Sequence, residues 1–224
     1  MQQYILIVAG GKGERMKSAV PKQFIELHGK PMLMRTFEAF LNEAVHREFV
    51  IVLPGDYISE WKKLCQFHDF QIKHQIVESG PKRFHSVKSG LNLIPDNVLV
   101  AIHDAARPFV SKETIQRCFY TASRKGNAVP AVNFTESVRE VSGALNKIVD
   151  RNHLKIIQTP QVFNSLQIKN AYKQNFRENF TDDANVLESA GFQINLVEGN
   201  PENIKITYPS DLEFAEFLLS GKNK

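Results

Sequence analysis

The chain has 224 residues, of which 42% are hydrophobic and 23% charged, and a globular chain of this length buries roughly 70% of its unfolded surface. It therefore needs neither disulfides nor a structural metal to hold a core, and its composition excludes the collagenous and disordered classes. The net charge of +4 comes from 28 Lys and Arg residues spread along the chain. This spread indicates a solvated surface rather than a nucleic-acid footprint, although a pocket for a small polyanion would give the same composition.

From its N-terminal residues we expect neither a targeting segment nor a membrane span. Met1 to Gln3 lacks the basic segment of a signal peptide. The longest apolar run, Tyr4 to Ala9, is far shorter than the ~20 residues of a membrane span. The two cysteines, Cys65 and Cys118, form neither a disulfide framework nor a metal site, which suits a reducing compartment. We expect a cytoplasmic protein that binds no nucleic acid and no membrane.

From residue 3 to about residue 132, predicted strands alternate with predicted helices. Tyr4 to Val8 is apolar throughout, which predicts a strand buried on both faces. Pro31 to Ala44 has apolar residues at helical spacing after a proline in the first turn. Further strands are predicted at 49–53, 72–77 and 98–102, and further helices at 58–65 and 84–94. Such repeats predict an α/β fold with right-handed crossovers: a Rossmann-like, three-layer arrangement around a mostly parallel central sheet.

The pattern changes between residues 133 and 155, which are polar, β-branched and broken by Ser142-Gly143. This stretch is longer than most structureless connections. We expect a protruding β-hairpin arm, with Ser137 to Val141 leading out and Lys147 to Val149 leading back. Strand and helix character then resumes at 166–176, 183–190, 194–197 and 210–219. We expect a single domain over residues 1–224 that carries 133–155 as an extended arm.

A glycine-rich loop, Gly10-Gly11-Lys12-Gly13-Glu14-Arg15-Met16, directly follows the first strand. Loops at this end of a parallel sheet are usual ligand sites, and closely spaced glycines let backbone N–H groups approach phosphates. Neither the dinucleotide fingerprint nor the mononucleotide P-loop is present. Arg15 and the Lys22 of Pro21-Lys22-Gln23 place two cations beside the loop, which suits a triphosphate. The set predicts a nucleotide site; the alternative is a glycine turn with two surface cations.

The glycine loop followed by Pro21-Lys22-Gln23-Phe24 resembles the opening of the sugar-phosphate nucleotidyltransferases. Later landmarks narrow the resemblance to the 2-C-methyl-D-erythritol 4-phosphate cytidylyltransferases of the non-mevalonate isoprenoid pathway. These landmarks are His103-Asp104-Ala105-Ala106-Arg107-Pro108, Val149-Asp150-Arg151-Asn152, Thr159-Pro160-Gln161, Thr181-Asp182-Asp183 and Asn203-Ile204-Lys205-Ile206-Thr207. The resemblance runs in order from residue 4 to about 219. It implies transfer of CMP from CTP to a sugar-alcohol phosphate, with Mg²⁺ or another divalent cation, by a homodimer formed through the arm.

The resemblance implies a nucleotide site built from cations and glycines. Arg15 and Lys22 would hold the β- and γ-phosphates and Lys205 the α-phosphate, as the catalytic residues. Lys205 lies between apolar residues in a predicted strand, where a solvated lysine is less expected. The implied nucleotide contacts are Ala9, Gly10, Gly11, Gly13, Gly80 and Ser86. Gly80 would let the backbone approach a flat base, whereas a hydroxyl at a helix start is the alternative for Ser86.

The implied acceptor site consists of Asp104, Arg107, Ser137, Arg151 and Thr159. Asp104 ends the fourth predicted strand, where a carboxylate can orient a metal, a ribose hydroxyl or the acceptor's hydroxyls. The alternative is that Asp104 and Arg107 pair to lock the loop. The resemblance implies that Asp104 approaches the metal, directly or through water, and that Arg151 binds acceptor in the partner's site. Ser137 replaces the threonine that the family usually has at the start of the arm.

The predicted reaction needs no general base, because the attacking phosphate oxygen is already anionic at neutral pH, and the sequence offers no Ser-His-Asp or Cys-His set. Two other functions compete with it. One is a cytidylyltransferase for ribitol 5-phosphate. Ala105-Ala106 and Val149–Asn152, however, look more like the 2-C-methyl-D-erythritol 4-phosphate cytidylyltransferases. The other is a non-catalytic nucleotide-binding dimer, which would be expected to lack Arg15, Lys22 or Lys205.

Overall fold

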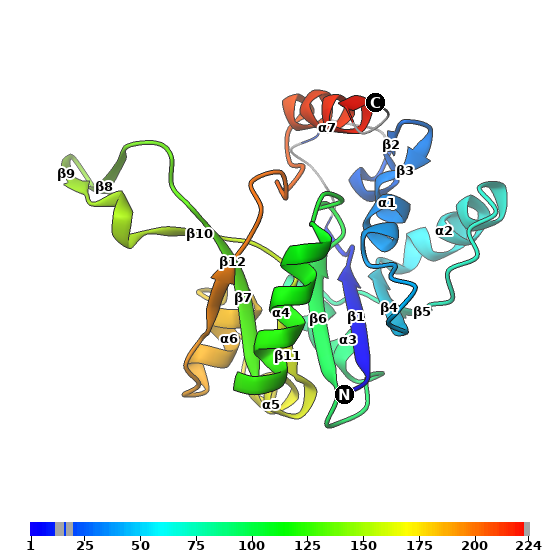
Figure 1. Ribbon diagram of the computed structural model, residues 1–224, viewed down its shortest axis with the longest axis horizontal. Coiled ribbons are helices and arrows are strands. Elements are labelled where there is room, and N and C mark those ends of the chain that lie inside the picture. The colour runs from blue at the N-terminus through cyan, green and yellow to red at the C-terminus, as the bar shows by residue number, and fades with distance from the viewer. Residues whose placement is uncertain (12–15, 17–19, 222–224) are drawn as a thin grey trace.

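The computed structural model describes residues 1–11, 16 and 20–221 and has a mostly parallel central sheet (Figure 1). The sheet has the order β10-β7-β11-β6-β1-β4-β5, and β12 pairs with β7. Its parallel part consists of β1 (Gln3–Val8), β4 (Arg47–Leu53), β5 (Gln75–Glu78) and β6 (Leu99–Asp104). The helices that alternate with these strands are α1 (Met32–Ala39), α2 (Gly55–Phe67), α3 (Arg83–Leu91) and α4 (Lys112–Lys125). The expected fold class is confirmed.

The remaining elements extend the sheet and cap one end of it. The further sheet strands are β7 (Asn127–Asn133), β10 (Lys155–Ile157), β11 (Gln161–Asn164) and β12 (Leu196–Glu198). The short 3-10 turn η2 (Lys22–Phe24) and the hairpin of β2 (Glu26–Leu27) and β3 (Lys30–Pro31) precede α1. The later helices are α5 (Ser165–Ala171), α6 (Asp183–Ser189) and α7 (Pro209–Gly221). None of the helices in the described ranges has the length and apolar character needed to cross a membrane.

Strand β1 is buried on both faces, as its unbroken apolar run predicts, because alternate side chains enter different cores. Ile5 and Ile7 pack in the core that also contains residues of α1, α2 and α4, including the buried Trp61. Tyr4 and Leu6 pack in the opposite core, which contains residues of α3, α5 and α6. Each face of the sheet is therefore covered by helices, and the carboxyl ends of β1, β4 and β6 meet at one edge.

The structure differs from the sequence expectations in two places that bear on the site. β11 runs antiparallel to both β6 and β7, and such a short strand gives little periodic signal. The predicted strand at 203–207 is not formed; the segment has no regular secondary structure. It is nevertheless anchored, because the backbone N–H of the buried Ile206 donates to the Ala106 carbonyl at 2.9 Å. The apolar residues of this segment thus reflect burial rather than strand pairing.

The expected arm is confirmed as a hairpin of β8 (Val138–Ser142) and β9 (Leu145–Val149). Its turn contains Gly143 with φ of 58°, a conformation that favours glycine. The two strands form a sheet of their own, and the chain returns to the body through the 3-10 turn η3 (Arg151–His153). Figure 1 shows the arm extending away from the central sheet.

Candidate active site

Two loops at the carboxyl ends of β1 and β5 pack directly against each other. A Cβ built on Gly10 would lie 2.9 Å from the Ser79 Cβ and 3.1 Å from the Ser86 Oγ. The first distance is shorter than real Cβ contacts allow, so the approach of the second loop requires glycine at position 10. The backbone N–H of Ala9 donates to the Val52 carbonyl at 2.9 Å, which holds the start of this loop to the sheet.

The rest of the predicted glycine loop is described only in part. Gly11 is exposed, and a Cβ there would meet nothing within 4 Å. Packing against the described residues therefore does not explain glycine at this position, whereas close approach of a ligand would. Gly13 and Arg15 lie outside the described residues, so their proposed contacts with phosphate stay predictions.

The second loop is closed by the Ser86 hydroxyl. Its Oγ accepts from the Gly80 N–H at 3.2 Å and donates to the Lys82 carbonyl at 3.1 Å. A Cβ on Gly80 would lie 2.4 Å from the His85 Cβ, so glycine is required here as well. Ser86 is buried and its hydroxyl is used within the loop. In this arrangement Ser86 shapes the loop, and its predicted contact with a base stays a prediction.

Three cationic side chains surround Asp104 where β6 ends. The Lys205 Nζ lies 3.0 Å from Oδ2, the Arg107 Nε 3.4 Å from the same oxygen, and the Arg83 Nε 3.6 Å from Oδ1. The Asp104 side chain is 12% exposed. Burial would raise the pKa of this carboxyl, but the charges of Lys205, Arg83 and Arg107 outweigh it and hold the pKa well below its ordinary value. Arg83 is also bound to Asp183, so the group carries three cations for two carboxylates, and this excess of positive charge attracts anions.

The structure brings the predicted cations Lys22 and Lys205 to the same segment. The Lys22 Nζ donates to the Ile206 carbonyl at 2.9 Å, next to Lys205 in the chain. Because Ile206 is itself anchored to Ala106, the segment connects η2 with the loop that follows β6. Lys22 is therefore held to the same segment as Lys205, and the contacts of both lysines with a triphosphate stay predictions.

Behind Asp104 lies an ion pair that the sequence reasoning missed. Both terminal nitrogens of Arg83 donate to the Asp183 carboxylate, at 2.8 and 2.7 Å, and the Tyr172 hydroxyl donates to the same carboxylate at 2.6 Å. Asp183 is completely buried. Burial and the negative charge of Asp183 raise the pKa of Tyr172 well above its ordinary value. The sequence offers two signals: Arg83 shortly after Gly80, and Asp183 in the Thr-Asp-Asp landmark. No local pattern indicates that these two residues pair.

Thr159 supports Asp104 from the opposite side. Its Oγ1 accepts from the Asp104 N–H at 3.1 Å and lies 2.9 Å from the His103 Nδ1. The His103 Nε2 lies 3.0 Å from the Arg107 carbonyl. A carbonyl only accepts, so Nε2 carries the proton and the Thr159 hydroxyl donates to Nδ1. Burial lowers the pKa of His103 to about 4, which keeps the ring neutral. Thr159 thus lies next to Asp104, but its hydroxyl is already hydrogen-bonded to the Asp104 N–H and to His103.

The predicted residues of the arm lie apart from this cluster. Ser137 and Arg151 are exposed, and the Arg151 Nη1 donates to the Thr135 carbonyl at 2.6 Å at the base of the arm. Figure 1 shows the arm directed away from the strand ends. The described contacts include none between Arg151 and Thr159, so their joint phosphate site stays a prediction.

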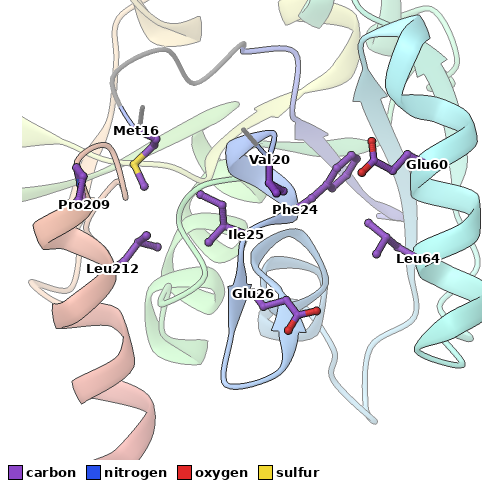
Figure 2. A pocket seen from close by; sticks show the side chains of 9 residues that line it. All are labelled: Met16, Val20, Phe24, Ile25, Glu26, Glu60, Leu64, Pro209 and Leu212. Carbon is purple, nitrogen blue, oxygen red and sulfur yellow. The ribbon is translucent and has the colours of Figure 1, made fainter. Parts of the chain in front are cut away.

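A cavity of about 450 Å³ lies behind η2 and beside the first turn of α7 (Figure 2). Its apolar lining residues are Met16, Val20, Phe24, Ile25, Leu64, Pro209 and Leu212, and its two charged ones are Glu26 and Glu60. Carboxylates repel phosphate, and none of the cations of the Asp104 cluster lines this cavity. On its described lining, the cavity is therefore distinct from the cationic cluster around Asp104.

Comparison with known proteins identifies the family. A family model described as 2-C-methyl-D-erythritol 4-phosphate cytidylyltransferase matches residues 3–221. Relatives of that name from Bacteroides fragilis and Bacteroides thetaiotaomicron are 50% and 46% identical, over 96% and 98% of this chain and 98% and 100% of their own. The crystal structure of the Thermus thermophilus protein of that name has a TM-score of 0.78 and 28% identity, covering 98% of this chain and all of that one. The chain belongs to the 2-C-methyl-D-erythritol 4-phosphate cytidylyltransferase family.

Proposed function

We propose that this chain transfers CMP from CTP to 2-C-methyl-D-erythritol 4-phosphate. The products are 4-diphosphocytidyl-2-C-methyl-D-erythritol and pyrophosphate, and the reaction belongs to non-mevalonate isoprenoid precursor synthesis, in the cytoplasm. The observation that carries the proposal is the cationic cluster around Asp104, in a chain that the family model matches over residues 3–221. No feature of the cluster favours ribitol 5-phosphate as the acceptor, so that alternative serves as the control substrate.

In the proposed step, an oxygen of the acceptor phosphate attacks the α-phosphorus of CTP. A bond forms between that oxygen and phosphorus, the bond to the β-phosphate oxygen breaks, and pyrophosphate leaves with the bonding electrons. The chain's task is to hold two mutually repelling anions in line and to offset the charge that moves to the leaving group. Lys22, Lys205 and Arg107 supply positive charge for this, with Arg15 as a further predicted cation.

Covalent catalysis by a cysteine is not needed and is disfavoured. Burial raises the pKa of Cys65 to about 11 and that of Cys118 to about 12, so both remain thiols at neutral pH. Cys118 is in addition fully enclosed in the core. Direct transfer between the two phosphates therefore needs no nucleophile from the chain.

The divalent cation in this proposal is Mg²⁺, or another that prefers oxygen ligands. Among the described residues, no three acidic, histidine or cysteine side chains are grouped closely enough to hold a metal by themselves. Mg²⁺ commonly binds through one or two carboxylates together with substrate phosphates and water. Asp104 offers one ionised carboxylate for such a site and would hold the ion directly or through water, in place of one of its present cationic partners. When bound, the ion would offset charge on the triphosphate oxygens.

A homodimer formed through the arm completes the proposal. The arm side chains Val141, Leu145 and Ile148 are 69%, 78% and 75% exposed. An isolated two-stranded hairpin is marginally stable in water. The pairing register places Val141 and Ile148 on one face of the hairpin, and exposed apolar residues on one face favour contact with another molecule. In the homodimer, the Arg151 of one protomer would help to bind the acceptor phosphate in its partner's site, with Ser137 as a further predicted contributor. The predicted contribution of Thr159 requires its hydroxyl to turn from the His103 Nδ1 to the phosphate.

The test is pyrophosphate release from CTP and Mg²⁺, with 2-C-methyl-D-erythritol 4-phosphate and ribitol 5-phosphate as parallel acceptors. We expect turnover with the first acceptor only. Turnover with ribitol 5-phosphate alone would keep the nucleotide site and reassign the acceptor. Absence of turnover with both acceptors, in a protein that binds CTP, would support the non-catalytic alternative.

A further inference from the structure

Among the three cations around Asp104, Lys205 is held differently from the two arginines. Arg83 is bound through both terminal nitrogens to Asp183, and the Arg107 Nη1 donates to the Asn203 carbonyl at 2.7 Å. Each arginine therefore keeps a second acceptor if its contact with Asp104 changes. In the part of the chain that the structure describes, Lys205 makes its ion pair with Asp104.

The exposed fractions of the side chains also distinguish Lys205 from the two arginines. The Lys205 side chain is 41% exposed, whereas those of Arg83, Arg107 and Asp104 are 29%, 12% and 12% exposed. Of the three cations around Asp104, Lys205 is therefore the most accessible to an anion that arrives from solvent. That anion must then compete with the Asp104 carboxylate, which lies 3.0 Å from the Lys205 Nζ. A like charge at that distance disfavours the incoming anion.

We infer that Asp104 is an internal counter-anion for Lys205, which an entering polyphosphate must displace before it binds the ammonium. The inference rests on the proposed function, since that function assigns Lys205 to the nucleotide's phosphates. Its consequence is that Asp104 weakens polyphosphate binding to the free protein. After the exchange, Asp104 keeps the two arginines and becomes available to the acceptor. Removal of its charge should therefore tighten polyphosphate binding and slow turnover at the same time.

The test measures binding of inorganic tripolyphosphate by calorimetry in EDTA, so that no metal and no acceptor take part. Four proteins are compared: the unchanged chain, Asp104→Asn, Lys205→Met and the double variant. We expect Asp104→Asn to bind roughly threefold to tenfold more tightly and Lys205→Met to bind more weakly. In the Lys205→Met background, Asp104→Asn should gain less than about twofold.

Two results would overturn the inference. The first is Asp104→Asn binding tripolyphosphate no more tightly than the unchanged chain. The second is an equal gain from Asp104→Asn with and without Lys205, because that gain would come from net charge alone. Glu60→Gln is the matched control: it removes one negative charge at the separate cavity and should leave the affinity within about twofold. Thermal melting checks that each variant is folded.

A second measurement needs no change at Asp104, in case that variant does not fold. The side-chain ammonium signal of Lys205 is recorded in a ¹⁵N-lysine spectrum and assigned by its loss in Lys205→Met. It should move on addition of saturating tripolyphosphate. A signal that stays in place would mean that Lys205 remains with Asp104, which contradicts the inference.

The acceptor assay separates this inference from the proposed function. Turnover of CTP with 2-C-methyl-D-erythritol 4-phosphate, together with an unmoved Lys205 signal, would reject the exchange and keep the proposed function. A chain that binds neither tripolyphosphate nor CTP and shows no turnover would reject both.

Discussion

The cluster at the strand ends and the arm are built in opposite ways. Around Asp104, each charged side chain contacts at least one other group of the same chain. Arg83 binds Asp183, for example, and Lys205 pairs with Asp104. On the arm, apolar side chains such as Leu145 and Ile148 face solvent. The comparison teaches that the described cations of the cluster find their partners within one chain, whereas the arm leaves apolar surface exposed, which favours contact with another molecule. Changes in the two regions should therefore have different consequences.

The largest effect is expected where the cluster is most deeply buried. Arg83→Met removes the partner of Asp183 and leaves a buried, uncompensated carboxylate, which should lower the free energy of unfolding by about 3–5 kcal/mol. Urea unfolding measures this. Lys82→Met, next to it, removes only an exposed contact with Glu178 at 3.8 Å and should cost less than about 1 kcal/mol. Equal effects of the two changes would mean that the Arg83 pair does not support the cluster.

Lys22→Ala should leave the fold intact and lower turnover on the order of 10²–10³-fold, by analogy with the loss of one preorganised charge in a transition state. The measurement is the rate of pyrophosphate release at saturating CTP, with circular dichroism as the check on folding. Lys63→Ala, on the exposed side of α2, serves as the matched control. Turnover of Lys22→Ala within about threefold of the unchanged chain would remove this lysine from the mechanism.

The neutral ring of His103 predicts a pH dependence of stability. Its pKa is lowered from 6.5 to about 4 by burial, so between these values the unfolded chain binds a proton that the folded chain does not. The free energy of unfolding should therefore fall as the pH drops from about 6.5 to about 4, by roughly 3 kcal/mol in total from this group. Urea unfolding at pH 7, 6 and 5 measures the slope.

His103→Asn should flatten that slope, whereas the exposed His46→Gln should not. Parallel stability curves for the unchanged chain and His103→Asn would contradict the assignment. A flattened slope would distinguish the cluster around Asp104 from the arm, because the effect comes from His103, which is buried beside Asp104 and neutral.

The smallest effect on folding, and a large effect on assembly, is expected at the arm. Ile148→Asp places a charge on an exposed apolar surface, so it should weaken the proposed dimer by about tenfold or more while the fold is kept. Light scattering over a range of protein concentrations measures the mass. Ile148→Val keeps the apolar surface and should keep the dimer. A monomeric unchanged chain at all concentrations would remove the dimer from the proposal.

Much of this architecture could be predicted because its signals are local. The unbroken apolar run of β1, the proline at the start of α1 and the glycine in the turn of the arm each act within a few residues. Asp104 at the end of β6 was predicted in the same way, from the position of a carboxylate after an apolar strand. Pairings between distant segments were not predicted: Arg83 with Asp183 and Thr159 with His103 join residues 100 and 56 positions apart.

The sequence by itself determined the strand–helix alternation, the arm and the family to which the chain belongs, since these depend on periodicity and on ordered motifs. Only the tertiary structure decided which hydroxyls and cations remain available to a ligand. The family resemblance predicts that Ser86 and Thr159 contact a ligand. In the folded chain the Ser86 hydroxyl donates to the Lys82 carbonyl and the Thr159 hydroxyl to His103. The physical reason is that a buried polar group must find a partner, and the fold determines which partner is within reach.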